Sequence, residues 1–195
     1  MSRVAHPEAA KVVFTGSTEA GRTVRVGAAA PIKRVTLELG AKSANIVFAD
    51  ADLERAAAAA PGAVFGNAGQ DCCARSRILV ERSVYDRFLQ LLVDATGRFK
   101  VGSPDEPGVE MGPLISASHR EKVASFVEGK PLFQGSVPEG PGFWYPCTLV
   151  ESRTQDRGAR EEELGAVAKV SQFADEGDAM RDAHEPPYGL AGPAS

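Results

Sequence analysis

Cysteine and histidine are scarce in this sequence, with three of each among 195 residues. An odd number of three cysteines does not make a disulfide framework and is typical of a reducing compartment, so we expect a cytoplasmic protein. None of the histidines stands at metal-ligand spacing from another or from the adjacent cysteines Cys72 and Cys73. A structural zinc site needs further ligands nearby, so we predict that the chain holds no metal.

The sequence also lacks an excess of basic residues and any long apolar run. Its 22 Lys and Arg are outnumbered by 26 Asp and Glu, and the net charge is −4. Binding to the phosphate backbone of a nucleic acid requires a basic face, so this balance argues against a nucleic-acid partner. No apolar run reaches the roughly 18 residues that a membrane-spanning helix needs, and the N-terminal segment MSRVAHPEAAKVVF has no signal-peptide layout. We predict no membrane association.

What the sequence does contain is an alternation of short β-rich runs and helix-compatible stretches. The strand candidates are residues 11–14, 32–39, 45–48 and 77–81. Helix-compatible stretches follow the first, third and fourth of these. The helix after residues 45–48 is expected to begin at Asp50 or Asp52 and to be kinked or interrupted near Pro61. Strands that alternate with helices predict an α/β fold with mostly parallel strands.

The string TGSTEAG, residues 15–21, lies between a predicted strand and a predicted helix. A glycine at such a junction lets the backbone approach a ligand, and the helix N-terminus offers unpaired N–H groups to a phosphate. A plain helix start capped by Ser17 or Thr18 explains the string equally well, because capping residues produce such strings freely. Both interpretations stay open on these residues alone.

Glu38 is a carboxylate near the end of an otherwise apolar strand, in VTLELGAK. Ligand sites in α/β folds lie at the carboxyl ends of strands, and a partly buried glutamate there has a raised pKa suited to a general base. Alternatively, Glu38 is a solvated edge residue or a partner of Lys42. Strand alternation places it opposite Leu37 and Leu39.

Cys72 and Cys73 follow Gly69-Gln70 in the string FGNAGQDCCARSR. Adjacent cysteines rarely pair with each other because the geometry is strained. Free cysteine is among the most buried residue types, which favours packed sulfur; a loop after a helix end favours a nucleophile that reaches substrate. In an extended segment one cysteine would face a site while its neighbour packs.

Together, FTGSTEAG, LELGAKS and FGNAGQDCCARSR, with Cys72 placed 34 residues after Glu38, resemble the signatures of the NAD(P)-dependent aldehyde dehydrogenase family. Later strings, GFWYPCT and EEELG, resemble degraded forms of the family's further motifs. The resemblance runs from about His6 to Leu190. It implies an α/β fold with a partial cofactor-binding sheet followed by a catalytic domain with a parallel or mixed sheet. Residues 1–40 would be the C-terminal part of the dinucleotide-binding domain, and residues 41–195 the thiol-bearing catalytic domain.

The resemblance also implies residue roles. Cys72 stands at the family's nucleophile and Glu38 at its general base, which activates the water that hydrolyses the thioester. The substrate would be a small-molecule aldehyde and the cofactor NAD or NADP. Cys73 would be a packed bystander. The cofactor-binding residues implied are Gly16, Ser17, Thr18, Glu19, Ala20, Gly21, Leu39 and Glu162.

The resemblance is to longer proteins, so we expect a truncated member that lacks most of the N-terminal cofactor domain and the C-terminal end. An apolar face exposed by truncation would cause association, as a homo-oligomer or otherwise. Two other functions stay open: a non-catalytic remnant or subunit partner, and a cofactor-independent cysteine esterase. The sequence departs from the family's usual residues at Ala41, Ala44, Glu163, Leu164 and Ala166, where glycine, proline, an aliphatic residue, an aromatic residue and proline are usual.

Overall fold

The computed structural model describes residues 2–192, and its internal contacts divide the chain into two compact units, Met1–Gly40 and Ala41–Ser195. The assignment of the units to a cofactor domain and a catalytic domain stays a prediction.

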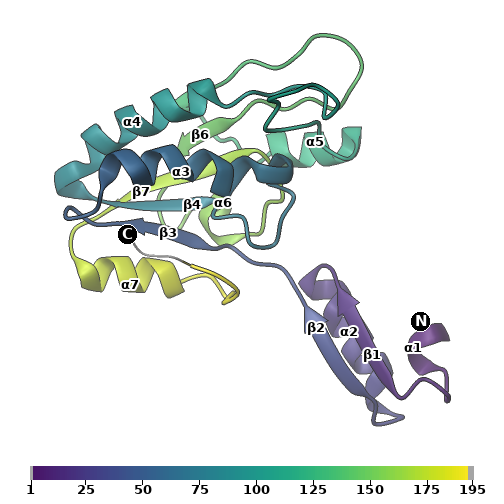
Figure 1. The fold of residues 1–195 in the computed structure, drawn as a ribbon. Helices are drawn as coiled ribbons and strands as arrows, with labels where there is room; N and C mark the ends of the chain where they lie inside the picture. Colours follow the sequence, from purple (N-terminus) through teal and green to yellow (C-terminus); the bar gives the residue numbers. More distant parts are fainter. Residues whose placement is uncertain (1, 193–195) are drawn as a thin grey trace. The chain divides into compact units, whose positions relative to one another are not determined.

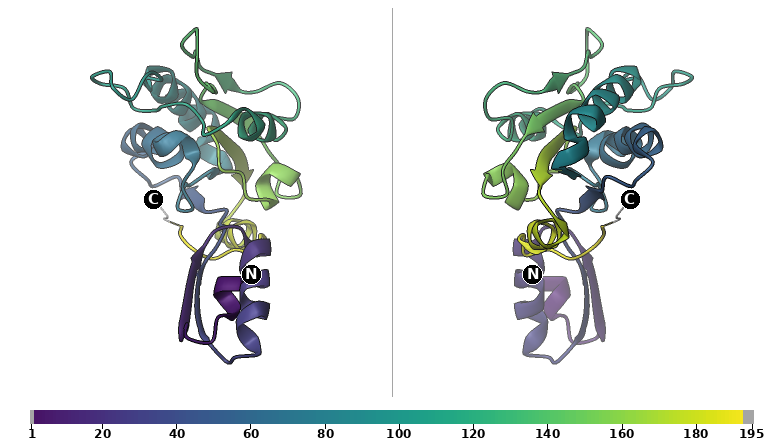
Figure 2. Two further views of the ribbon diagram at one scale, coloured as in Figure 1. Left: turned by 90° about the vertical axis from the view of Figure 1, so that its right-hand side faces the viewer. Right: turned by 90° about the vertical axis from the view of Figure 1, so that its left-hand side faces the viewer.

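The first unit is a strand–helix–strand motif with a short helix in front of it (Figure 1). Strands β1 (Lys11–Thr15) and β2 (Arg34–Glu38) pair in parallel, with Thr15 opposite Glu38. Helix α2 (Thr18–Ala29) connects them and lies along one face of the pair (Figure 2), and α1 (Ser2–Ala5) precedes β1. Both strands alternate between exposed and half-buried positions, as the period of two in the sequence predicts.

The second unit is built on one mixed sheet of five strands. Their order is β3-β4-β7-β6-β5, and among the described residues β5 and β6 are the one antiparallel pair of this sheet. The predicted α/β fold with mostly parallel strands is confirmed. The bounds are Ala44–Val47 for β3, Arg77–Glu81 for β4, Phe133–Gln134 for β5, Thr148–Glu151 for β6 and Val167–Phe173 for β7.

Helices cover both faces of this sheet (Figure 1). Helices α3 (Leu53–Phe65) and α4 (Tyr85–Arg98) pack together over one face, and α7 (Glu176–His184) lies against the other. Strand β4 contributes side chains to the hydrophobic core on each face of the sheet. Ile78 and Val80 face α3 and α4, and Leu79 packs near α7 on the opposite face. The shorter helices are η1 (Gly66–Gly69), η2 (Arg82–Val84), α5 (Ala117–Ala124) and α6 (Arg157–Arg160).

Helix α3 bears on one expectation from the sequence. Of the kink or interruption predicted near Pro61, the interruption is wrong, because α3 continues through Pro61 to Phe65. Proline inside a helix costs about 3 kcal/mol. The buried stripe of α3, which includes Ala57, Ala60 and Val64, packs into the core and offsets that cost. Of the two candidate caps, Asp52 is the N-cap, and its side chain accepts a hydrogen bond from the Arg55 N–H.

Within residues 2–192, no helix is both long enough and apolar enough to span a bilayer.

Candidate active site

The loop that carries Cys72 begins with a reversal of the chain directly after α3. Asn67, Ala68 and Gly69 have φ angles of 51°, 56° and 69°, all in the left-handed region. Two non-glycine residues in this region store strain that the surrounding structure must offset, and such strain is concentrated at functional sites. The reversal turns the chain from the end of α3 into the cysteine segment.

Gln70 holds this loop in place from both of its ends. Its backbone N–H and its side-chain Nε2 both donate to the Asn67 carbonyl, and the Asn67 Nδ2 donates to the Gln70 carbonyl at 2.9 Å. The Gln70 Oε1 accepts a hydrogen bond from the Ile115 N–H at 3.0 Å. The glutamine two residues before Cys72 therefore anchors the loop to the segment before α5.

Cys72 and Cys73 lie side by side in a turn, and both are exposed. Their sulfur atoms are 3.9 Å apart, and the Asp71 carboxylate accepts a hydrogen bond from the Cys73 N–H at 3.0 Å. The prediction that Cys73 packs away is wrong, because the segment is a turn and not an extended strand with side chains on opposite faces. Desolvation, together with Cys73 and Asp71 beside it, raises the pKa of the Cys72 thiol.

The same three residues form a cluster of potential metal-ligating atoms. One Asp71 oxygen and the two sulfurs lie within 4.8 Å of one another among the residues that the structure describes. All three side chains stand on an exposed turn, where such groups are common without an ion. The expectation that the chain holds no metal stays a prediction.

Residues 161–165, which we call the EEELG segment, are held at several successive positions. The Ala41 N–H donates to Glu162 Oε1 at 2.9 Å, and His119 Nε2 lies 2.6 Å from the Leu164 carbonyl oxygen. A Cβ atom on Gly69 would come within 2.0 Å of the Gly165 carbonyl oxygen, so only glycine permits this approach. The cysteine loop thus packs directly on the segment that carries Glu162.

Behind this contact lies a buried group of charges. Lys42 Nζ and Glu163 Oε2 are 3.6 Å apart, and both side chains are fully buried. Burial lowers the pKa of Lys42 from 10.5 to about 8, although Glu163 opposes that change. Burial also raises the pKa of Glu163, against the attraction of Lys42 and Lys169. The lowered pKa of Lys42 and the raised pKa of Glu163 have the same cause, because the protein interior disfavours the charged form of either group.

The remaining predicted residues lie in the first unit. Ser17 is the N-cap of α2, and its side chain accepts from the Ala20 N–H at 3.2 Å. A Cβ on Gly16 would clash with the Phe14 ring at 2.7 Å, and one on Gly21 would clash with Leu39 at 2.5 Å. Thr18 and Glu19 form the first turn of α2. Both close contacts are with side-chain ends, Phe14 for Gly16 and Leu39 for Gly21, so a larger residue at either position would require that side chain to shift.

Glu38 ends β2, where its carbonyl accepts a hydrogen bond from the Gly16 N–H at 3.0 Å. Its side chain is exposed, so the partial burial expected of it is not found. The strand register explains this exposure, because Glu38 shares its face with Arg34 and Thr36 while the apolar Val35 and Leu37 turn inward. The role of Glu38 relative to Cys72 stays a prediction.

The structure therefore joins two of the predicted motifs in one place, the cysteine loop and the EEELG segment. Sequence reasoning missed the residues that make this joint: Lys42, Gln70, His119 and the pair Gly69 and Gly165. One signal for Lys42 was present, since Glu163 puts a carboxylate where an aliphatic residue was expected. The contacts of Gln70 and His119 with residues about 45 positions away carry no local sequence pattern.

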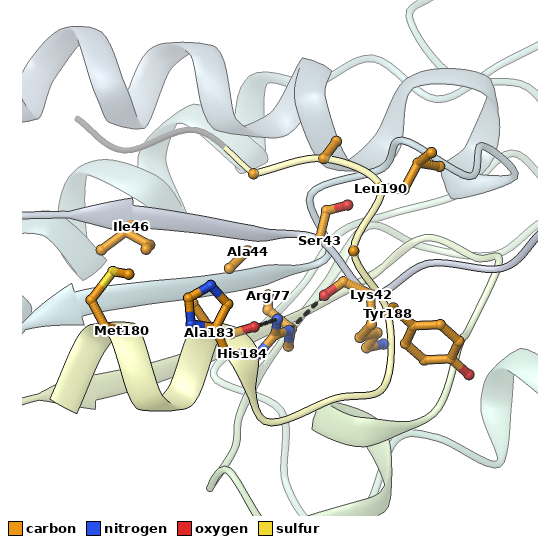
Figure 3. Close-up of a pocket in the computed structure, with 13 residues that line it drawn as sticks. Lys42, Ser43, Ala44, Ile46, Arg77, Met180, Ala183, His184, Tyr188 and Leu190 are labelled. Carbon is orange, nitrogen blue, oxygen red and sulfur yellow. Dashed lines mark hydrogen bonds between the residues drawn. The ribbon is translucent and has the colours of Figure 1, made fainter. Parts of the chain in front are cut away.

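A cavity of about 450 Å³ lies elsewhere in the second unit, between β3 and the chain that follows α7 (Figure 3). Arg77 spans its floor, donating to the carbonyl oxygens of Lys42, Asp182 and Ala183. Its described walls include neither Cys72 nor Glu162. This cavity is therefore separate from the cysteine loop.

A model of the Aldehyde dehydrogenase family matches residues 2–194. The chain belongs to the aldehyde dehydrogenase family. It is 42% identical to betaine aldehyde dehydrogenase of Bacillus subtilis, over 93% of this chain and 39% of that protein. The solved structure of betaine aldehyde dehydrogenase from Staphylococcus aureus in complex with NAD+ is similar to this chain, with a TM-score of 0.92 and 37% identity. The match covers 98% of this chain and 40% of that chain. Gamma-glutamyl-gamma-aminobutyraldehyde dehydrogenase from Burkholderia cenocepacia gives a TM-score of 0.94 at 37% identity, over 99% of this chain and 41% of that chain.

The chain thus spans about two fifths of the length of the aldehyde dehydrogenases that it matches. The predicted family is confirmed.

Proposed function

We propose that the chain takes part in the oxidation of an aldehyde to a carboxylic acid with NAD or NADP, with Cys72 as nucleophile and Glu38 as general base. Membership of the family supports the reaction class. The observation that carries the proposal for Cys72 is the close approach of Gly69 to Gly165, which seats the cysteine loop on the segment of Glu162; the role of Glu38 rests on the family alone. Nucleophile and cofactor ligand then belong to one packed structure.

Cys72 begins the reaction by adding its thiolate to the aldehyde carbon, which forms a C–S bond and a thiohemiacetal. The thiol proton goes to solvent, a step made harder by the raised pKa of Cys72. Glu162 and the first turn of α2 would hold NAD or NADP, which would supply the acceptor for the hydride that leaves this carbon. Cys72 then holds the acyl group as a thioester. Glu38 takes a proton from water, the water oxygen bonds to the acyl carbon, and the C–S bond breaks to release the acid and the Cys72 thiolate.

Residues in both units fit the cofactor that this reaction needs. The first turn of α2, capped by Ser17, presents backbone N–H groups of the kind that bind a pyrophosphate. Ser17, Glu19 and Ala20 also line a shallow depression of about 410 Å³ on the surface of the first unit. In the second unit, the Glu162 carboxylate has a fixed position against Ala41 and could accept hydrogen bonds from ribose hydroxyls.

The test measures NAD(P)H formation from betaine aldehyde and a series of aliphatic aldehydes, together with calorimetric titration of NAD+. We expect Cys72→Ser to abolish turnover, and Glu38→Gln to lower it by a factor of about 100 to 10,000. Cys73→Ser is the matched control, since it removes an equally exposed thiol one residue away, and it should retain turnover.

Absence of heat at millimolar NAD+ would exclude a dehydrogenase that acts on its own. Hydrolysis of an activated phenyl ester without cofactor, lost in Cys72→Ser, would then indicate a cysteine esterase. The exposed Cys72 on its turn favours this second function, because an ester can reach it without a cofactor site. If neither activity is detected, the role as a remnant or subunit partner remains. Association of the chain, with itself or with another subunit, is the measurement for that role.

A further inference from the structure

Two pairs of neighbouring residues face each other across the second unit. Ala41 and Lys42 come from the segment before β3, and Glu162 and Glu163 come from the EEELG segment, about 120 positions later. The first contact is a hydrogen bond from the Ala41 N–H to Glu162. The second is the Lys42–Glu163 ion pair. Each residue of one segment is thus matched to a residue of the other in order.

The ion pair has unusual surroundings. Both side chains have no exposed surface, and the 3.6 Å separation of nitrogen and oxygen is longer than a hydrogen bond. Within residues 2–192, neither Lys42 Nζ nor either Glu163 carboxylate oxygen has a hydrogen-bond partner. Their mutual attraction, together with the attraction of Lys169 for Glu163, compensates part of the cost of their burial. A buried pair of this kind adds little to stability, because desolvation cancels most of the Coulombic gain.

An interaction that adds little stability can still fix an orientation. We propose that the Lys42–Glu163 ion pair positions Glu162, by holding the EEELG segment so that the Glu162 carboxylate meets the Ala41 N–H and stands ready for the cofactor ribose. The role toward the cofactor rests on the proposed function; the role toward the Ala41–Glu162 hydrogen bond does not. Lys42 and Glu163 act through Glu162 and are positioning residues.

The arrangement should depend on pH. Lys42 faces Glu163, and Lys169 and Arg77 are the other charged groups near enough to affect it. Above about pH 8 the Lys42 ammonium loses its proton, and the attraction that holds Glu163 is lost with it. We expect the Ala41–Glu162 hydrogen bond to loosen in the same range, because the segment that carries Glu162 is then held less firmly.

The decisive experiment follows the Ala41 backbone amide by NMR in the full chain, which needs no cofactor. We expect its proton shift to titrate with a midpoint near pH 8 and its exchange protection at pH 6.5 to fall about tenfold in Glu163→Gln, as expected for a lost hydrogen bond to a charged group. Amides of β7 should keep their protection. A shift that is flat in pH, or protection unchanged in Glu163→Gln, would overturn the proposal.

Lys42→Met could unfold the chain by leaving Glu163 unpaired, so the double variant Lys42→Met/Glu163→Leu is measured as well. Replacement of both charges by apolar groups is usually tolerated. In the double variant the Ala41 shift should be independent of pH between 7 and 9. If it still titrates near pH 8, the titrating group is another one and the proposal fails.

NAD+ titration gives the second readout. We expect NAD+ to bind about tenfold more weakly to the wild type at pH 9 than at pH 7, as an increase in its dissociation constant. In the double variant this constant should not change with pH. Glu161→Gln, which breaks only the exposed Arg157–Glu161 pair on the same segment, is the control and should behave as the wild type. Lack of NAD+ binding in all variants would refute the proposed function, while the Ala41 amide would still decide the positioning role.

Discussion

At the scale of single residues, the site depends on glycines whose side-chain space is already filled. Gly69 combines a left-handed φ of 69° with a carbonyl oxygen where its Cβ would be. Gly66, three residues earlier, has a φ of −49° and open space around it. The two glycines of the string FGNAGQ therefore differ in what the structure requires of them. The sequence alone does not reveal this difference.

We expect Gly69→Ala to destabilise the protein by about 1–3 kcal/mol, because it adds backbone strain and a clash with Gly165. The measurement is the free energy of unfolding from urea titration. Gly66→Ala is the matched control, and it should change this free energy by well under 1 kcal/mol, since nothing lies within 4 Å of the new methyl group. Equal effects of the two substitutions would contradict the packing of the loop described above.

At the scale of elements, α3 shows how packing overrides local preference. Its N-terminus follows the sequence, since Asp52 caps it as one of the two aspartates predicted to do so. Its C-terminus does not, since Pro61 would end an isolated helix but is retained within a helix packed on α4 and the sheet. The end of α3 sets where the loop of Cys72 begins.

We expect Asp52→Ala to lower the free energy of unfolding by about 1 kcal/mol, because the Arg55 N–H loses its acceptor. Asp50→Ala removes a carboxylate two residues away that does not cap α3, and it should leave this free energy within about 0.5 kcal/mol of the wild type. Thermal unfolding followed by circular dichroism distinguishes the two. Identical losses would mean that general charge, and not the cap, supports α3.

At the scale of the whole molecule, the buried charges link stability to pH. The pKa of Lys42 is lowered from 10.5 to about 8 in the folded state. Between these values the unfolded chain binds the proton that the folded chain has released. Stability from this group therefore increases as pH rises through the window and is lowest below about pH 8.

We expect the free energy of unfolding of the wild type to rise, relative to that of Lys42→Met/Glu163→Leu, by about 2 kcal/mol from pH 7 to 9.5. Urea titrations of both proteins at several pH values measure this difference, and the shared cysteines and tyrosines cancel in it. Parallel curves would show that Lys42 has an ordinary pKa. Over the same pH range, Glu162 is thus expected to lose its fixed position while the free energy of unfolding of the protein rises.

The sequence by itself determined the family, the α/β class, and the elements whose signals are local. These local signals depend on residues a few positions apart: the alternation in β2, the cap of α2 at Ser17 and the string around Cys72. Hydrophobic periodicity and capping preferences predict such features directly. The tertiary structure alone decided which strings meet. Ala41 with Glu162, Lys42 with Glu163 and Gly69 with Gly165 join segments about 95 to 120 positions apart, and the order of the central sheet brings them together. It also decided that Cys73 is exposed and Lys42 buried, because burial depends on what packs around a residue and not on its type.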